Sequence, residues 1–126
     1  MIGDALENVV SAFDGFGRVI SRERGIEVRF QNLSGARRNV IEKFGFDFAD
    51  GLTLDEWEFI RRTFQKRHLL SHNTGVIDEN YILKANDPSA TVGRKIRVTH
   101  EEVTASVAIV EALGKRLFSG IFPPTP

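Results

Sequence analysis

The stretch Thr53–Gly75, TLDEWEFIRRTFQKRHLLSHNTG, has the most complete helix pattern in this chain of 126 residues. Thr53 and Glu56 have the spacing of a capping box, in which each side chain accepts a hydrogen bond from the other residue's backbone amide. The apolar residues that follow recur at the three- and four-residue steps of one helix face: Leu54, Trp57, Ile60, Phe64 and Leu70. We therefore expect a helix that begins at Thr53 and ends near Asn73, because Gly75 can take the left-handed conformation that follows a helix.

The N-terminal third shows the same periodicity twice. Residues 4–24 are expected to form a long helix with an apolar face of Leu6, Val9, Val10, Phe13, Ile20 and either Phe16 or Gly17. Asp4 and Glu7 resemble a second capping box, and Gly25 is a suitable end for this helix. Residues 34–44 are expected to form a shorter helix with an apolar face of Ala36, Val40, Ile41 and Phe44.

The C-terminal third is expected to contain one short and one long helix. The short helix follows Asp78 and covers Tyr81 and Leu83. The long helix opens with a third capping box, Thr99 with Glu102. Its apolar face comprises Val103, Val107, Val110, Gly114, Leu117 and Ile121.

Non-helical segments connect these helices. Residues 26–30 alternate like a strand, but no second strand is evident to pair with them, so an extended connector and a continued helix both stay open. Residues 86–89 have turn chemistry, and residues 93–98 read as a basic, partly extended loop. Four to five amphipathic helices predict an all-α fold, an antiparallel bundle. We expect a single domain, residues 1–121, followed by a proline-rich tail, residues 122–126.

The composition excludes several classes of protein. Lys and Arg number 17, as do Asp and Glu, so the formal net charge is zero and a histone-like basic coat is excluded. The absence of cysteine excludes disulfides, thiolate metal sites and a cysteine nucleophile. No apolar run approaches the roughly 20 residues that cross a bilayer. We expect no membrane association and no targeting segment, and hence a cytoplasmic protein.

A local concentration of charge stands out against this neutral background. Between Phe59 and Ile77 the chain has four basic residues and no acidic one, namely Arg61, Arg62, Lys66 and Arg67. Such a stripe favours a phosphate-bearing partner, although it is also typical of a solvated helix face.

The histidines suggest proton-transfer chemistry rather than a metal site. His68 and His72 are four residues apart and share a helix face, which would supply half of a zinc site. The zincin pattern, however, requires a glutamate directly after the first histidine, and Leu69 stands there. No Walker loop and no Gly-x-Ser-x-Gly elbow occurs in the sequence. We therefore expect neither a metal nor a cofactor.

The spacing of Arg67 and His72 needs an explanation if the two act together. Residues five apart differ by about 140° around a straight helix. The two side chains must therefore converge through the reach of arginine or across a dimer. Arginine suits a phosphoryl oxygen because it is always charged and binds in a bidentate manner. Histidine can take or give a proton near neutral pH.

The residues Arg67–His72, RHLLSH, fit the Arg-x4-His motif of HEPN domains (higher eukaryotes and prokaryotes nucleotide-binding). The continuation at residues 73–81, NTGVIDENY, resembles that of several prokaryotic members, as do residues 87–89 and 93–96 and the long C-terminal helix. The resemblance covers residues 54–118. It implies a bundle of four to five helices that frequently dimerises so that two motifs meet in one cleft.

The resemblance further implies a metal-independent endoribonuclease, as found in toxin–antitoxin, phage-defence and CRISPR-linked systems. In this reading Arg67 and His72 are the catalytic residues, and the 2′-OH of single-stranded RNA attacks the adjacent phosphorus. The expected supporting and RNA-binding residues are His68, Asn73, Ser71 and Lys66.

Two other readings stay open. The chain can be a catalytically silent HEPN module for dimerisation or RNA binding, or a helical partner-binding protein in which the motif is a coincidence. The expected partners are RNA, a second copy of the chain, and an antitoxin or a fused effector or sensor domain. We expect Phe64, Leu69 and Leu70 to supply apolar contacts at a homodimer interface near the motif.

Overall fold

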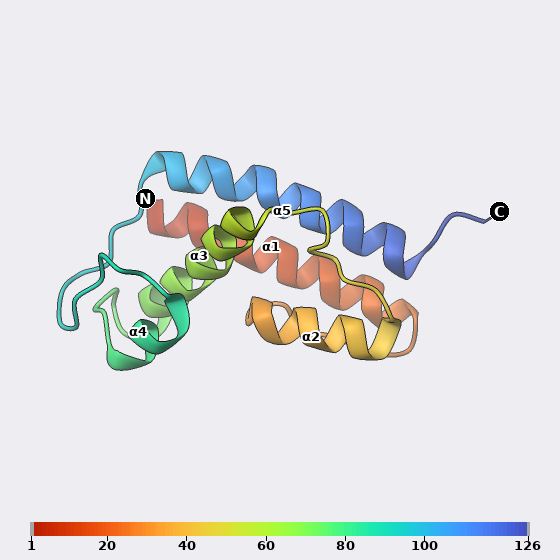
Figure 1. The fold of residues 1–126 in the computed structure, drawn as a ribbon, viewed down its shortest axis with the longest axis horizontal. Coiled ribbons are helices and arrows are strands. Elements are labelled where there is room, and N and C mark those ends of the chain that lie inside the picture. The colour runs from red at the N-terminus through yellow and green to blue at the C-terminus, as the bar shows by residue number, and fades with distance from the viewer. Residues whose placement is uncertain (1, 126) are drawn as a thin grey trace.

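In the computed structural model, residues 2–125 are described, and they form five α-helices and no strand. The helices are α1 (Ile2–Glu23), α2 (Leu33–Phe44), α3 (Leu54–His72), α4 (Glu79–Ala85) and α5 (His100–Ile121) (Figure 1). The all-α prediction is therefore confirmed for the described part of the chain. None of these helices is both long enough and apolar enough to cross a membrane.

The directions of the helices agree only partly with an antiparallel bundle. α3 runs opposite to α1, because Leu70 lies beside Gly3 while the Phe64 ring packs against Phe13. α1 and α5 lie along one another in the same direction (Figure 1), and Gly114 of α5 faces Phe16 of α1. The antiparallel expectation is wrong for this pair. Through α3 the chain returns to the end of the molecule at which α1 starts (Figure 1). Because α5 begins at that end, α1 and α5 point in the same direction.

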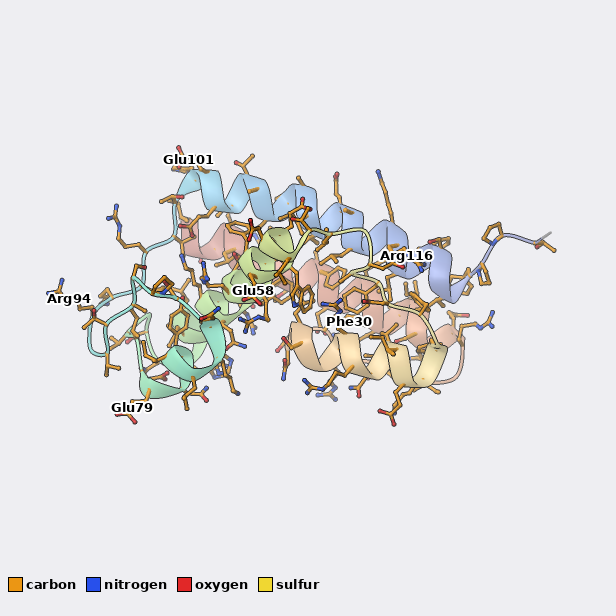
Figure 2. All side chains as sticks on the ribbon, in the orientation of Figure 1. Phe30, Glu58, Glu79, Arg94, Glu101 and Arg116 are labelled. Atoms are coloured by element: carbon orange, nitrogen blue, oxygen red, sulfur yellow. The ribbon has the colours of Figure 1, made fainter. Side chains whose placement is uncertain are left out.

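Four phenylalanine rings form the centre of the core. Phe13 of α1 makes edge contacts with the rings of Phe30, Phe48 and Phe64, at centroid distances of 5.3, 6.3 and 6.2 Å. Phe30 and Phe48 come from the connectors on either side of α2, and Phe64 comes from α3. Figure 2 shows Phe30 pointing inward among the helices. Aromatic edge contacts thus tie α1, α3 and both connectors together.

The connector before α2 is extended rather than helical. Val28 and Phe30, two residues apart, are both buried, as the alternation in the sequence indicated. No strand within residues 2–125 pairs with this segment. Instead the amide of Val28 donates to Ser21 Oγ (2.9 Å), and the amide of Phe30 donates to Asp14 Oδ1 (2.7 Å). Buried polar side chains of α1 therefore satisfy backbone groups that a sheet would otherwise satisfy.

The predicted capping boxes have three different outcomes. The box of Thr53 and Glu56 is present in full at the start of α3. At α5, Thr99 accepts from the amide of Glu102 (3.1 Å), but the carboxylate of Glu102 binds a lysine of α3 instead. The box expected at residues 4 and 7 is wrong, because α1 already begins at Ile2 and both acids lie inside the helix.

Some residues expected on apolar faces are exposed. Ile41, Leu54 and Val107 have 45%, 75% and 43% of their surface accessible, because no other element covers them. In α1, Gly17 is buried whereas Phe16 is 39% exposed, so Gly17 rather than Phe16 belongs to the buried face of the helix. The short helix predicted after Asp78 is confirmed as α4.

Candidate functional site

The basic residues of α3 hold other elements in place. Arg61 donates to the carbonyl of Lys84, and Arg62 donates to the carbonyls of Ala85 (3.2 Å) and Asn86 (2.5 Å). These arginines bind the last carbonyls of α4, where the helix dipole favours positive charge. The basic stripe predicted from the sequence is therefore not fully available to a phosphate-bearing partner, and it is not a simple solvated face either, because Arg61 and Arg62 are bound to α4.

Two of the predicted supporting residues, Lys66 and Asn73, use their side chains to bind groups of other segments. Lys66 donates to the carbonyl of Arg97 and to Glu102, both at 2.9 Å, and so fastens the start of α5 to α3. Asn73 is the C-cap of α3, and its Nδ2 donates to the carbonyl of Val76 (2.8 Å). Both side chains are engaged in positioning the backbone.

Arg67, His68 and His72 are brought together in one cleft. The cleft has a volume of about 230 Å³, and the residues that complete its lining come from the connector before α2, from α3 and from α4: Gln31, Asn32, Gln65 and Lys84. Arginine's reach is thus sufficient for convergence with His72 inside a single chain. A second copy is not required to bring these residue types together.

Arg67 is held by Glu7 of α1. Nε donates to Oε2 (2.6 Å) and Nη2 to Oε1 (3.1 Å) of that carboxylate, while Nη1 lies 3.5 Å from Gln31 Oε1. Ser11 and Ser71 also donate to Glu7, at 3.0 and 3.3 Å. Ser71 therefore supports the carboxylate behind Arg67 rather than lining the cleft. The guanidinium nitrogen that lacks a carboxylate partner, Nη1, is the one beside Gln31 in the cleft lining.

The pKa values of Glu7 and His68 are both lowered, but for different reasons. The hydrogen bonds and charge of Arg67 lower the pKa of Glu7, although partial burial opposes this shift. Partial desolvation lowers the pKa of His68, and the neighbouring His72, Arg67 and Lys84 lower it further. The rings of His68 and His72 are 4.4 Å apart between centroids. His68 is therefore biased towards the neutral form, in which it can accept a proton.

The apolar residues expected at a dimer interface are used within the chain. Phe64 and Leu69 are each 2% exposed, and Leu70 packs against the main core. Leu69 belongs to a second cluster with Ile77, Tyr81 and Ala85. That part of the argument for a motif-centred dimer is wrong, because one chain already buries these side chains.

Sequence reasoning missed five residues that shape the site: Glu7, Gln31, Asn32, Gln65 and Lys84. A signal for Glu7 existed in α1. Polar residues recur there at alternating steps of four and three, namely Glu7, Ser11, Asp14, Arg18 and Ser21. This spacing marks a polar stripe facing α3 and the connector. The others come together only through the tertiary fold.

Among residues 2–125, no three histidine, aspartate or glutamate side chains gather where they could hold a metal ion.

Comparison with protein-family models, with curated proteins and with solved structures finds no match to this chain. A function must therefore be argued from the chain's own residues.

Proposed function

We propose that this chain is a HEPN-like endoribonuclease domain that cleaves single-stranded RNA without a metal ion. The observation that carries the proposal is the cleft that Arg67, His68 and His72 share with Lys84. Its lining combines fixed positive charge with two histidines and, among the described residues, includes no carboxylate. Such a lining suits a phosphodiester and proton transfer to and from its oxygens.

The proposed reaction is an internal transfer at phosphorus. The 2′-oxygen of the RNA forms a bond to the adjacent phosphorus as the bond from phosphorus to the 5′-oxygen breaks. A neutral histidine takes the 2′ proton and a protonated histidine gives one to the departing 5′-oxygen. The lowered pKa of His68 suits the accepting role, and His72 beside it assists the transfer. Arg67 stabilises the charge that develops on the phosphoryl oxygens.

Cleavage of a fluorescent single-stranded RNA in EDTA tests the proposal. We expect the wild-type chain to cut and Arg67→Ala to lose on the order of a hundredfold or more in rate, as for removal of a transition-state donor. His72→Ala should lose a similar factor. Arg24→Ala is a suitable control, because the exposed side chain of this arginine lies outside the cleft. Equal activity of all variants would contradict the assignment.

The products give an independent test. Attack by the 2′-OH leaves a 2′,3′-cyclic phosphate and a 5′-hydroxyl, so RNA that is methylated at the 2′ position should survive. Efficient cutting of DNA, or strict dependence on added Mg²⁺, would overturn this mechanism.

A specific observation also favours the silent alternative, an RNA-binding or dimerisation module. Arg67 is only 8% exposed and two of its nitrogens bind Glu7, which is the pattern of a structural ion pair. Retention of RNA without cleavage would support this alternative. Neither binding nor cleavage would favour a partner-binding protein with a coincidental motif.

A homodimer and an antitoxin or fused-domain partner belong to the same proposal. The mass measured by light scattering at micromolar concentration, with and without RNA, tests the dimer. Since one chain completes the Arg67–His72 cleft, we expect the rate per chain to be independent of its concentration.

A further inference from the structure

We propose that the motif cleft is the middle of a continuous groove that carries a single RNA strand across α3, past the start of α2. This inference rests on the proposed function and names the path of its substrate. Two further hollows adjoin the cleft, with volumes of about 300 and 280 Å³. Asn32 lines all three hollows.

The shared residues show how the hollows connect. Gln31 lines both the cleft and the first neighbouring hollow, which continues towards Arg18 and Arg29. Gln65 and Lys84 line both the cleft and the second neighbour, which continues towards Arg38. In Figure 1 the start of α2 lies opposite α4 across α3, and the second hollow is formed by these three helices. The groove thus leaves the motif in two directions, as internal cleavage of a strand requires.

The lining of this groove is strongly polar and positive. Its six cations are Arg18, Arg29, Arg38, Arg61, Arg67 and Lys84, of which Arg18, Arg61 and Arg67 are paired with Asp14, Glu58 and Glu7. Among the described residues, Asp14 is the one carboxylate in the lining, and no apolar side chain is included. The chain as a whole has zero net charge. Concentration of positive charge along one track therefore marks a site for a polyanion.

Several of these cations are free to bind one. The side chains of Arg29, Arg38 and Lys84 are exposed, and they form no hydrogen bond or ion pair with another described residue. Arg18 contributes less, because its Nε is buried and pairs with Asp14 Oδ2 at 3.3 Å, so a ligand cannot reach this nitrogen. The groove therefore has donor capacity that the protein itself does not use.

The neutral residues of the groove favour a nucleic acid over an acidic peptide. Amide side chains of Gln31, Asn32 and Gln65 lie among the cations. Asn32 Oδ1 caps α2 by accepting from the amide of Gly35 (3.1 Å), whereas its Nδ2 and the whole amide of Gln65 form no hydrogen bond with another described residue and can bond a base edge. Guanidinium groups such as those of Arg29 and Arg38 can also stack on bases. A carboxylate-rich peptide lacks the planar bases on which these guanidinium groups can stack.

Fluorescence anisotropy with a labelled, 2′-O-methylated 20-nucleotide single strand tests the path, because this probe binds without being cut. The test variant is Arg29→Gln with Arg38→Gln, which removes one cation on each side of the motif. The control is Arg24→Gln with Lys115→Gln, which removes two exposed cations outside the groove. We expect the test variant to bind about tenfold more weakly at low salt. Its slope of log Kd against log salt should fall by about 1.4, at about 0.7 for each lost contact to a single strand.

The outcomes separate this inference from the proposed function. If test and control variants bind alike while Arg67→Ala still abolishes cleavage of unmodified RNA, the groove path is overturned and the proposed function stands. If the wild-type chain neither binds the probe nor cleaves RNA, both are overturned. Competition by polyglutamate as effective as that by unlabelled RNA would overturn the commitment to a nucleic acid.

Discussion

Glu7 has the contacts of a positioning residue for Arg67. Its carboxylate binds Nε and Nη2, which turns Nη1 towards Gln31 in the cleft lining. Ser11 and Ser71 fix the same carboxylate from two helices. A guanidinium fixed in this way keeps one donor in place for a phosphoryl oxygen, so its orientation costs no ordering during the reaction.

Glu7→Gln should therefore separate catalysis from binding. We expect kcat to fall by on the order of tenfold or more, because Arg67 loses its fixed orientation, while the affinity for RNA is unchanged or rises as a negative charge is lost. Single-turnover cleavage and anisotropy measure the two quantities. Asp50→Asn is the matched control, since Asp50 binds Arg116 in the same bidentate manner far from the cleft. A parallel loss of binding and rate in Glu7→Gln would indicate a merely structural ion pair.

His68 gives the site a defined pH response. Its pKa in the folded chain lies below the ordinary value of 6.5, chiefly because the exposed ring is partly desolvated. As the pH falls below 6.5, the unfolded chain therefore binds a proton that the folded chain does not, and the free energy of unfolding decreases. We expect His68→Gln to flatten this decrease, measured by urea unfolding between pH 5 and 7.5. An unchanged slope in the variant would show that other groups cause the loss.

At the scale of elements, the glycines of α1 control how the connector approaches. A Cβ on Gly17 would lie 2.3 Å from ring atoms of Phe30, whereas one on Gly15 would meet no atom within 4 Å. The connector carries Gln31 and Asn32 into the groove directly after Phe30. Because Gly17 has no side chain, Phe30 can pack closely on α1, and this packing sets the position of Gln31 and Asn32 in the proposed RNA path.

Substitution of these two glycines offers a controlled comparison. We expect Gly17→Ala to lower the free energy of unfolding by about 1–3 kcal/mol through overpacking, and to weaken RNA binding by moving the connector. Gly15→Ala in the same helix should instead stabilise the chain by up to about 1 kcal/mol. Thermal and urea unfolding check both values. Equal effects at the two positions would contradict the close packing of Phe30 on α1.

The elements show which features the sequence could predict. The helix at Thr53 was predictable because capping and periodicity are local and act within a few residues. The role of Glu7 could not be predicted. Its spacing of three residues from Asp4 is compatible with a capping box, and it is equally compatible with an ion pair to a residue that is distant in the sequence. The exposure of Leu54 was also not predictable, since periodicity identifies an apolar position but not whether another element covers it.

The same limit applies to the candidate site. Arg67, His68 and His72 were found from one local motif, and the cleft contains all three. Lys66 and Ser71 belong to the same stretch, but their side chains point to Glu102 and Glu7, which are distant in the sequence. A basic stripe indicates available charge. Only the tertiary fold shows which of its members is already paired.

At the scale of the whole molecule, the residues that line the proposed groove come from elements that belong to two unequal hydrophobic clusters. The main core comprises residues of α1, α2, α3 and α5 and both connectors of α2. The second cluster is small, with Leu69, Ile77, Tyr81 and Ala85 buried beneath the loop that follows α4. Lys84 belongs to this smaller part, whereas Arg29 and Arg38 belong to the larger one. Binding of RNA across the groove would therefore connect the two clusters.

This division predicts unequal local stability. The seven residues of α4 pack mainly against α3, and the phenol of Tyr81 anchors the helix from within the small cluster. Its hydroxyl donates to Asp87 (2.8 Å), and burial together with that carboxylate raises the pKa of Tyr81 above its ordinary value, so the donor proton is retained. We expect amide hydrogens of α4 to exchange well before those of α1 and α5.

Tyr81→Ala should release α4 without unfolding the rest of the molecule. We expect exchange in residues 79–98 to accelerate at least about tenfold, since the small cluster loses its largest buried side chain, while α1 and α5 keep slow exchange. RNA affinity should fall because Lys84 loses its fixed place beside the cleft. Leu83→Ala is the control, as this side chain of the same helix is 84% exposed and its loss should change neither quantity. Equal acceleration of exchange in α1 and α5 would show instead that the two clusters unfold as one cooperative unit, and that RNA meets a groove which is already rigid.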